Sequence, residues 1–536
     1  MGDPSYRIVI FYEYPAAAVL RLVEKRVFRL SQVAKSSLIV TVFNILGIGL
    51  GTLSNIVIAA KFGAGKEMDV YLAATAVPLF ITSIFSSALT FTFIPIFAEY
   101  RLNDPSEIWN AVNSFLNLAT AATIVLCIVG ILLANTIMKV VTPGFTPEKV
   151  HRSAELLRWL FPIIVFTTIN ELLASIYYSN GKFVIPSFNK ILSPLVVIFF
   201  VFSFHSFLNT ESIIFALLVA AVIQCVLLSL GFSITRDFPY SFIFDYKHAG
   251  VRRILKLMTP LVLGMIVYRA VPLYDRFFLS RLAEGSISHI GYAAQLMNIF
   301  PAVIVSGLSV SMFPVMSTYA AERKWSELGD IMTKGIRIVF FLSIPFVVLL
   351  GIYGKPIIQL FLERGAFTAA DTTSVYRAFA IYLLALPAGV IGTIVSQGFY
   401  ALQLNRTIAM IGVAMMLLYI LLCFVSIRFW SYLAIPIAYA VYHNCTILTT
   451  SNILGRKIRA IIWLPIIHFF VKCAVSALFS ALLIYPAVRY ENGSVLAVNV
   501  LCAAAFVIYF SINKCVFHLE EPSLIWRSFP IRLKRT

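Results

Sequence analysis

The chain has 536 residues, of which 60% are hydrophobic and 12% are charged, with a mean hydropathy of +0.91. Soluble domains are about 45–50% apolar and about 25% charged, so this composition excludes a soluble enzyme, a disordered chain and a collagen-like fibre. The formal net charge of +18 comes from basic residues in short loops and termini, which is typical of positive-inside topology and argues against nucleic-acid binding.

Residues 1–37 are basic and lack a long apolar run or a small-residue cleavage site, so we expect a cytoplasmic N-terminus and no signal peptide. A helix that crosses a hydrocarbon core of ~30 Å needs about 20 apolar residues. Apolar runs of this kind predict an all-α polytopic membrane protein with about fourteen transmembrane helices, at about residues 38–60, 70–98, 112–138, 154–178, 183–207, 212–233, 253–281, 289–318, 331–353, 375–401, 406–427, 430–453, 463–488 and 494–513.

The distribution of Lys and Arg gives the expected topology. With the N-terminus inside, about 26 basic residues fall in cytoplasmic segments and about 12 outside, which predicts that both termini are cytoplasmic. The cysteines lie within or beside apolar runs and form no CxxC pair, so we expect neither a disulfide framework nor a metal site. They are Cys127, Cys225, Cys423, Cys445, Cys473, Cys502 and Cys515.

An internal repeat relates the two halves of the chain. Gly65–Thr75 is similar to Gly285–Gln295, and Gly144–Thr146 is similar to Ala366–Thr368, in both cases at an offset of about 220 residues. The repeat predicts two six-helix lobes of the same topology, and parallel repeats often place a transporter's substrate site between lobes. The expected segments are an N-lobe at 38–235, a C-lobe at 236–455, two further helices at 456–513 and a basic cytoplasmic tail at 514–536.

Motifs of soluble enzymes are not evident. The sequence has no Walker A loop, no HExxH and no GxSxG in a strand-like context. We therefore expect a transporter without a cofactor, driven by the substrate's own gradient, by the membrane potential or by a coupling ion such as Na⁺, H⁺ or Cl⁻. The glycines of Gly47–Gly51 and Gly63–Gly65 are expected to permit close helix packing or a bend.

Ionisable side chains within spans are costly and point to function, and the seventh span has the densest group. Arg269 and Arg276 are seven residues apart, which on a continuous helix places them on one face about 10 Å apart. Pro272 between them predicts a kink. Two guanidinium groups suit a diphosphate, which accepts bidentate hydrogen bonds. The structural alternative is an Arg–Asp pair that includes Asp275, with Arg276 extended toward the outer surface.

Three further charges in spans are candidates. Lys190, in the fifth span, either lines a cavity or extends its ammonium group to the membrane surface. Glu171, near the middle of the fourth span, either pairs with Lys190 or binds a coupling cation. Asp69 lies at the outer end of the second span, where capping of that helix explains it adequately.

Short motifs recur in one register over about residues 38–455, namely Phe62–Gly65, Asp69, Pro78, Ile84–Phe85, Ile94–Tyr100, Gly181–Pro186, Gly291–Met297, Pro301, Phe313–Pro314, Gly365–Thr368 and Gly398–Tyr400. Together they resemble the MurJ/MviN family of lipid II flippases. The resemblance implies the multidrug/oligosaccharidyl-lipid/polysaccharide exporter fold, with two lobes around a central cavity. It also implies that the chain moves lipid-linked peptidoglycan precursor to the outer leaflet of the bacterial inner membrane by alternating access.

The cavity charges of this family are largely absent, although Asp69 is retained. Uncharged residues stand where the family carries arginines and acids: Ile48, Ser54 and Asn55 in the first helix, Thr82 and Ser83 in the second, and Gln295 and Asn298 in the eighth. Our hypothesis is that the seventh helix supplies the missing charge. We predict substrate contacts from Arg269, Arg276, Asp275, Gln295, Asn298, Asn55, Ser54 and Lys190, and gating or ion coupling by Asp69, Glu171 and Pro272.

Two other functions fit the same residues. A protein of this fold can export another polyprenyl-linked glycan, or exchange a cationic drug for Na⁺ or H⁺, and a cavity lined by Glu171 and aromatic side chains with no exposed arginine favours the drug. Alternatively, a non-transporting scaffold can recruit cell-wall synthesis or division proteins through its basic loops and tail. A cavity closed by packed side chains favours the scaffold.

Overall fold

The computed structural model describes residues 40–103, 107–235, 238–458, 463–490, 495–519 and 521. The expected N-terminal segment 1–37 and residues 522–536 of the expected tail lie outside the described residues. Every regular element of the described chain is a helix, and loops or extended linkers join the helices. Its helices are Val40–Phe62, α2 (Lys66–Asn103), α3 (Ile108–Val141), α4 (Pro147–Leu160), α5 (Pro162–Ser179), α6 (Val184–Leu208), α7 (Glu211–Thr235), α8 (Ala249–Arg269), α9 (Val271–Leu279), α10 (Ser286–Ala321), α11 (Trp325–Leu362), α12 (Ala369–Leu383), α13 (Leu386–Ala401), α14 (Asn405–Trp430), the 3-10 turn η1 (Ser431–Leu433), α15 (Ala434–Ile458), α16 (Trp463–Tyr490) and α17 (Val495–Cys515).

The membrane-spanning character of these helices is confirmed, but the expected number of fourteen is not. Eleven helices of the described chain are long and apolar enough to cross a membrane, or twelve if the bent pair α12 and α13 is one span. The uncertainty comes from broken helices. Asn405–Ile458 passes as one 54-residue span, yet it contains α14 and α15, which turn back on each other at η1 and pack together.

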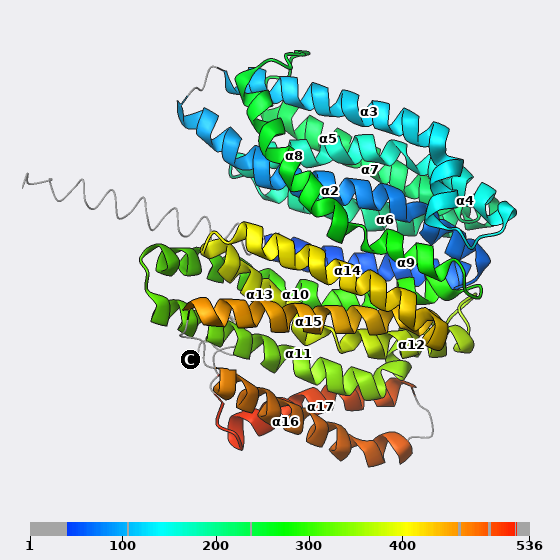
Figure 1. The fold of residues 1–536 in the computed structure, drawn as a ribbon. Helices are drawn as coiled ribbons and strands as arrows, with labels where there is room; N and C mark the ends of the chain where they lie inside the picture. The colour runs from blue at the N-terminus through cyan, green and yellow to red at the C-terminus, as the bar shows by residue number, and fades with distance from the viewer. Residues whose placement is uncertain are drawn as a thin grey trace, which may run out of the picture.

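The helices form two groups that lie against each other, with α16 and α17 beside α11 at the edge of the second group (Figure 1). In the first group α2 packs on α4 and α5, and α6 packs on α7; in the second α10 packs on α12 and α13. The seventh span, α8 and α9, reaches both groups. Although the sequence assigns it to the C-lobe, α8 packs mainly on α2 and α3 of the first group.

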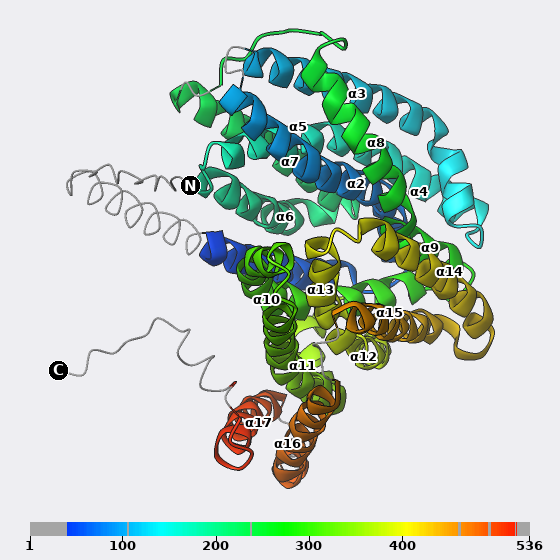
Figure 2. The same cartoon turned by 60° about the vertical axis from the view of Figure 1, so that its left-hand side comes forward.

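The buried core shows where the two groups join. Its largest cluster is continuous across them, because Val57 and Met68 of the first group share it with Ile287, Tyr292 and Phe367 of the second. A separate cluster lies within the first group and the start of α8, with members Leu89, Phe93, Phe115, Tyr177, Phe232 and Ile254. The lobes therefore share a core at the end of the molecule where the chain passes from Phe62 into α2 (Figure 2).

Two glycines allow the lobes to approach at this end. Gly63 (φ +64) and Gly365 (φ +62) adopt the left-handed conformation that side chains disfavour, and a Cβ on Gly63 would lie 2.5 Å from the carbonyl oxygen of Ala366. The expectation of close packing was wrong for Gly47, Gly49 and Gly51. A Cβ on any of these three meets no atom within 4 Å, because that part of the helix Val40–Phe62 lies on an open surface.

Candidate functional site

Asp69 joins the two lobes at their shared end. Its carboxylate is buried and accepts hydrogen bonds from the backbone N–H of Gly285 (2.7 Å), the backbone N–H of Ser288 (2.8 Å) and the Ser288 hydroxyl (2.8 Å). These donors form the first turn of α10, where the helix dipole stabilises a negative charge. The interpretation that Asp69 caps its own helix was therefore incomplete, because the residue caps α10 of the opposite lobe.

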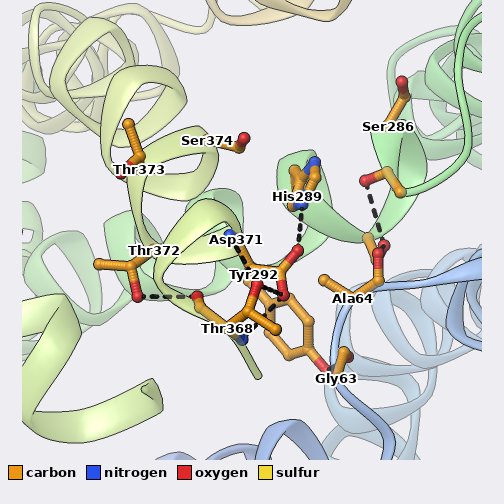
Figure 3. A network of polar contacts seen from close by, with 12 residues as sticks. Gly63, Ala64, Ser286, His289, Tyr292, Thr368, Asp371, Thr372, Thr373 and Ser374 are labelled. Atoms are coloured by element: carbon orange, nitrogen blue, oxygen red, sulfur yellow. Dashed lines mark hydrogen bonds and ion pairs between the residues drawn. The ribbon is translucent and has the colours of Figure 1, made fainter. Parts of the chain in front are cut away.

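Three more hydrogen bonds cross the lobe interface beside Asp69, and we call these contacts together with those of Asp69 the seam. The Tyr292 hydroxyl donates to the carbonyl oxygen of Gly63 (2.9 Å), and the Ser288 hydroxyl also lies 2.8 Å from that of Ala64 (Figure 3). The backbone N–H of Ala366 donates to the carbonyl oxygen of Ala60 (2.8 Å). Most of these bonds use backbone atoms, so the seam depends on close approach of the two chains.

The α12 end of the seam is held by a second carboxylate. Asp371 completes a capping box at the start of α12, in which it accepts from the backbone N–H of Thr368 (2.9 Å) and the Thr368 side chain accepts from the backbone N–H of Asp371. The other carboxylate oxygen lies 2.9 Å from Nε2 of His289 on α10, as Figure 3 shows. Asp371 therefore fixes α12 against the same turn of α10 that Asp69 caps.

An ion pair that is exposed on its Glu284 side also crosses between the lobes at this end, whereas its Lys149 side chain is largely buried. Nζ of Lys149 lies 2.6 Å from a carboxylate oxygen of Glu284, and this hydrogen bond and the adjacent positive charge lower the pKa of Glu284 below its ordinary value. Such exposed pairs contribute little stability, since water screens them. The buried seam at Asp69 is the stronger link.

The seventh span is broken where its proline predicted a kink. The helix α8 ends at Arg269, and α9 begins at Val271 with Pro272 in its first turn, where a missing N–H costs nothing. Nη2 of Arg269 donates to the Ser87 hydroxyl (2.9 Å), whereas Nε of Arg276 donates to the carbonyl oxygen of Leu72 (3.4 Å).

The two arginines that we expected on one face have partners far apart on α2. Their partners on α2 are Ser87 and Leu72, fifteen residues apart, which corresponds to roughly 22 Å along the helix axis at 1.5 Å per residue. A diphosphate is far shorter than that distance. Arg269 and Arg276 therefore contact α2 at separate places and do not form one clamp in this structure, although α8 and α9 together pass as one span, Ala249–Leu279, with Ala270 between them.

Asp275 lies on α9 beside Arg276, whose charge acts on it, in the span that contacts both helix groups. It is buried and accepts a hydrogen bond from the hydroxyl of Tyr419 on α14, which is itself fully buried. Among the described residues no ion pair of Asp275 with an arginine is present. No local pattern predicted Tyr419 as a partner of Asp275, because α9 and α14 are distant in the chain.

Charged and hydroxyl side chains meet around the middle of α2. Arg269 contacts Ser87, and Glu171 of α5 accepts a hydrogen bond from the neighbouring Ser86 and lies within electrostatic range of Lys190 on α6. Arg269 and Lys190 are exposed and Glu171 is half-buried. We call these five side chains the α2 polar cluster. The sequence analysis did not identify Ser86 and Ser87, although these neighbouring serines lie beside Glu171 and Arg269.

The remaining predicted substrate residues lie on two other helices. Ser54 is buried and Asn55 half-buried on the helix Val40–Phe62, while on α10 Asn298 is exposed and Gln295 half-buried. Oε1 of Gln295 is buried and has no hydrogen-bond partner within the described chain. All seven cysteines are free thiols, and the described residues contain no group of three or more His, Cys, Asp or Glu positioned for a metal ion.

Comparisons with known proteins agree with one family. The family model described as Lipid II flippase MurJ matches residues 58–502. A protein of Buchnera aphidicola subsp. Acyrthosiphon pisum, named probable lipid II flippase MurJ, is 32% identical over 366 residues, which cover 66% of this chain and 70% of that protein. The lipid II flippase MurJ of Burkholderia cenocepacia is 25% identical over 393 residues, covering 72% and 76% of the two chains.

Solved structures show the same fold. A structure described as lipid II flippase MurJ in an inward closed conformation superposes with a TM-score of 0.75 at 21% identity, covering 90% of this chain and all of that one. An inward-facing multidrug resistance transporter of the MATE family, in the MOP superfamily, gives a TM-score of 0.66 at 14% identity over 78% of this chain and 98% of its own.

Proposed function

Because the chain belongs to the MurJ family of lipid II flippases, we propose that it moves lipid II, a lipid-linked peptidoglycan precursor, across the bacterial inner membrane. It is a multi-pass membrane transporter. The observation that carries this function is the match of the family over residues 58–502, most of both lobes. The relatives named above carry the same function in their names.

The diphosphate of lipid II is best accommodated at the α2 polar cluster. Arg269 and Lys190 are exposed cations, and the hydroxyls of Ser86 and Ser87 lie beside Glu171 and Arg269. An anion left unpaired in a low-dielectric site costs several kcal/mol, so basic partners are required. Uncharged side chains complete the proposed site at Gln295, Asn298, Asn55 and Ser54.

Alternating access requires the seam to open, and we propose that Asp69 and Pro272 act in this step. The seam closes the end of the lobe interface that the expected topology places on the periplasmic side. Pro272 begins α9 after the break at Ala270, so the two halves of the seventh span can change their angle without breaking a helix hydrogen bond at that point. Arg276 and Asp275, on α9, would move with it.

The remaining functional assignments are also proposals. Glu171 and Asp275 are ionisable groups within spans. A coupling ion, Na⁺, H⁺ or Cl⁻, would bind at one of these carboxylates or at a charge beside it. Flipping in proteoliposomes with an imposed gradient of each ion in turn identifies the coupling ion. We also propose that both termini are cytoplasmic and that cell-wall synthesis or division proteins contact the basic loops.

Complementation of a bacterial strain depleted of its own lipid II flippase tests the function. The wild-type chain should restore growth, Arg269→Ala should not, and Arg406→Ala should restore it, because Arg406 is an exposed arginine at the start of α14. Membrane expression is measured for each variant. Rescue by all three supports the flippase but rejects Arg269 as a substrate contact. Failure of the well-expressed wild-type chain would point to another polyprenyl-linked glycan.

A further inference from the structure

The segment between α7 and α8 connects the two lobes and has an unusual aromatic row. Aromatic side chains occupy every second position of its extended chain: Phe238, Tyr240, Phe242, Phe244 and Tyr246. A period of two would place all five on one side of a straight extended segment, but Phe238 is turned inward. Phe238 packs inward on Trp109 and Phe232, with ring centroids 5.4 Å and 5.3 Å apart.

Phe242, Phe244 and Tyr246 face outward, whereas the Tyr240 hydroxyl donates to Oδ1 of Asn117 on α3 (2.9 Å). Tyr240, Phe242, Phe244 and Tyr246 are 56%, 81%, 50% and 58% exposed. The linker is held in this orientation by α3, because Nδ2 of Asn113 donates to the carbonyl oxygen of Pro239 (3.0 Å) and Nδ2 of Asn117 donates to that of Ile243 (2.9 Å). These bonds leave the aromatic row uncovered by the described chain.

Hydrogen bonds from α3, more than a packed core, hold the linker in place. A cavity of about 390 Å³ lies under it, between α3, α5 and α7, and its lining includes Phe238 and Tyr240 of the linker. Close packing therefore does not explain why so many aromatic residues occur here. Their outward orientation needs another cause.

The position along α3 places the linker at the membrane surface. The 34 residues of α3 extend about 51 Å, which exceeds the ~30 Å hydrocarbon core, so the ends of α3 reach the headgroup region. Asn113 and Asn117 lie in the first three turns of α3 and hold the linker at this level. Aromatic side chains are enriched at the headgroup level of membrane proteins.

Exposed basic residues follow the aromatic row directly. Lys247, Arg252 and Lys256 are exposed and form no ion pair with a described residue, whereas Arg253 is paired with Glu99 at 2.7 Å. Arg252 and Lys256 are four residues apart and share one face of α8. Basic clusters beside a transmembrane helix attract anionic lipid headgroups.

We propose that the linker Phe238–Tyr246 and the first two turns of α8 form an interfacial anchor that binds anionic phospholipid headgroups of the bilayer. Phe242, Phe244 and Tyr246 enter the headgroup layer, and Lys247, Arg252 and Lys256 contact the phosphates. The anchor holds the junction of the two lobes at the membrane surface. It is independent of the cargo and of the α2 polar cluster.

Hydrogen–deuterium exchange of the full-length protein in nanodiscs tests the anchor. The amides of residues 241–247 should exchange more slowly in phosphatidylcholine containing phosphatidylglycerol than in phosphatidylcholine alone. Each engaged basic side chain is worth about 1 kcal/mol at an anionic surface, or about fivefold in exchange rate. The pair Arg252→Gln and Lys256→Gln should remove most of the difference, and Phe242→Ser with Phe244→Ser should raise exchange in both bilayers.

Arg323→Gln with Arg406→Gln is the matched control, because it removes two exposed basic residues outside the proposed anchor, one in the turn after α10 and one at the start of α14. It should leave the linker amides unchanged, and unaltered thermal unfolding verifies that each variant is folded. Equal exchange in neutral and anionic bilayers would overturn the proposal. So would slowing that appears only after a native membrane-protein extract is added, since that result assigns the aromatic row to a protein partner.

Discussion

The carboxylate of Asp69 on α2 caps α10 of the opposite lobe, where the backbone N–H of Ser288 donates to it at 2.8 Å. Asp69 is almost completely buried and receives two further hydrogen bonds, from Gly285 and from the Ser288 hydroxyl. One side chain thus satisfies two backbone N–H groups at the start of a helix, which have no partner within the helix, and also accepts from a side-chain hydroxyl. The state of the seam can therefore be followed at these amides.

Asp69→Asn should loosen the seam. The neutral amide retains an acceptor oxygen but loses the charge. A hydrogen bond to a charged group stabilises by about 1–2 kcal/mol more than a hydrogen bond between neutral groups. Losing that free energy corresponds to roughly a tenfold increase in the population of the open seam. Hydrogen exchange of the Gly285 and Ser288 amides should accelerate by about that factor. Asp330→Asn, at an exposed position of α11, is the control and should leave both amides unchanged. Unaltered exchange in Asp69→Asn would show that geometry, not charge, holds α10.

Gly365→Ala should prevent full closure of the same seam. Gly365 has φ +62 and its missing Cβ would collide with the carbonyl oxygen of Ala60, so a methyl group is strained and also sterically blocked. The Ala366 amide, which donates to Ala60, should lose protection from exchange, and lipid II flipping in proteoliposomes should fall. Gly49→Ala should change neither measurement, because a Cβ there meets no atom within 4 Å. Normal flipping by Gly365→Ala would mean that transport does not require this approach.

The sequence alone predicted the features that depend on neighbouring residues. Apolar runs indicated transmembrane helices, and Pro272 indicated the break in the seventh span, because each signal depends only on neighbouring residues. The partner of Asp69 was missed because α10 begins more than 200 residues later, and local capping of α2 already explained the residue. Long-range pairing depends on how the lobes pack, which no local pattern encodes.

The arginines illustrate the same limit. Their spacing of seven residues suggested a shared helix face, but it could not show that Arg269 reaches Ser87 and Arg276 reaches Leu72, because both partners lie on α2, more than 180 residues earlier in the chain. The pairing of Tyr419 with Asp275 joins α14 to α9 and likewise had no signal in the sequence.

Tyr419→Phe should destabilise the second lobe. The substitution leaves the buried Asp275 carboxylate without its Tyr419 hydroxyl donor, and an unsatisfied buried group costs about 1–3 kcal/mol, more when charged. The midpoint of thermal unfolding in detergent should decrease. Tyr439→Phe removes a hydroxyl from the neighbouring α15 that forms no hydrogen bond to a described residue, so its midpoint should stay near that of the wild type. The double variant Tyr419→Phe with Asp275→Asn should recover part of the loss, and a further decrease would contradict the pairing.

Arg269→Gln and Arg276→Gln should impair transport independently. The two guanidinium groups contact α2 at Ser87 and Leu72, roughly 22 Å apart along the helix, and substitutions separated by more than about 10 Å usually have additive free energies. Arg269→Gln should weaken binding of a soluble diphosphate headgroup analogue, because that residue belongs to the α2 polar cluster. Arg276→Gln should leave this binding unchanged and lower the rate of flipping, because its contact lies near the seam. A coupling energy above about 0.5 kcal/mol between the two substitutions would instead place both arginines on one bound diphosphate and restore the single-clamp geometry.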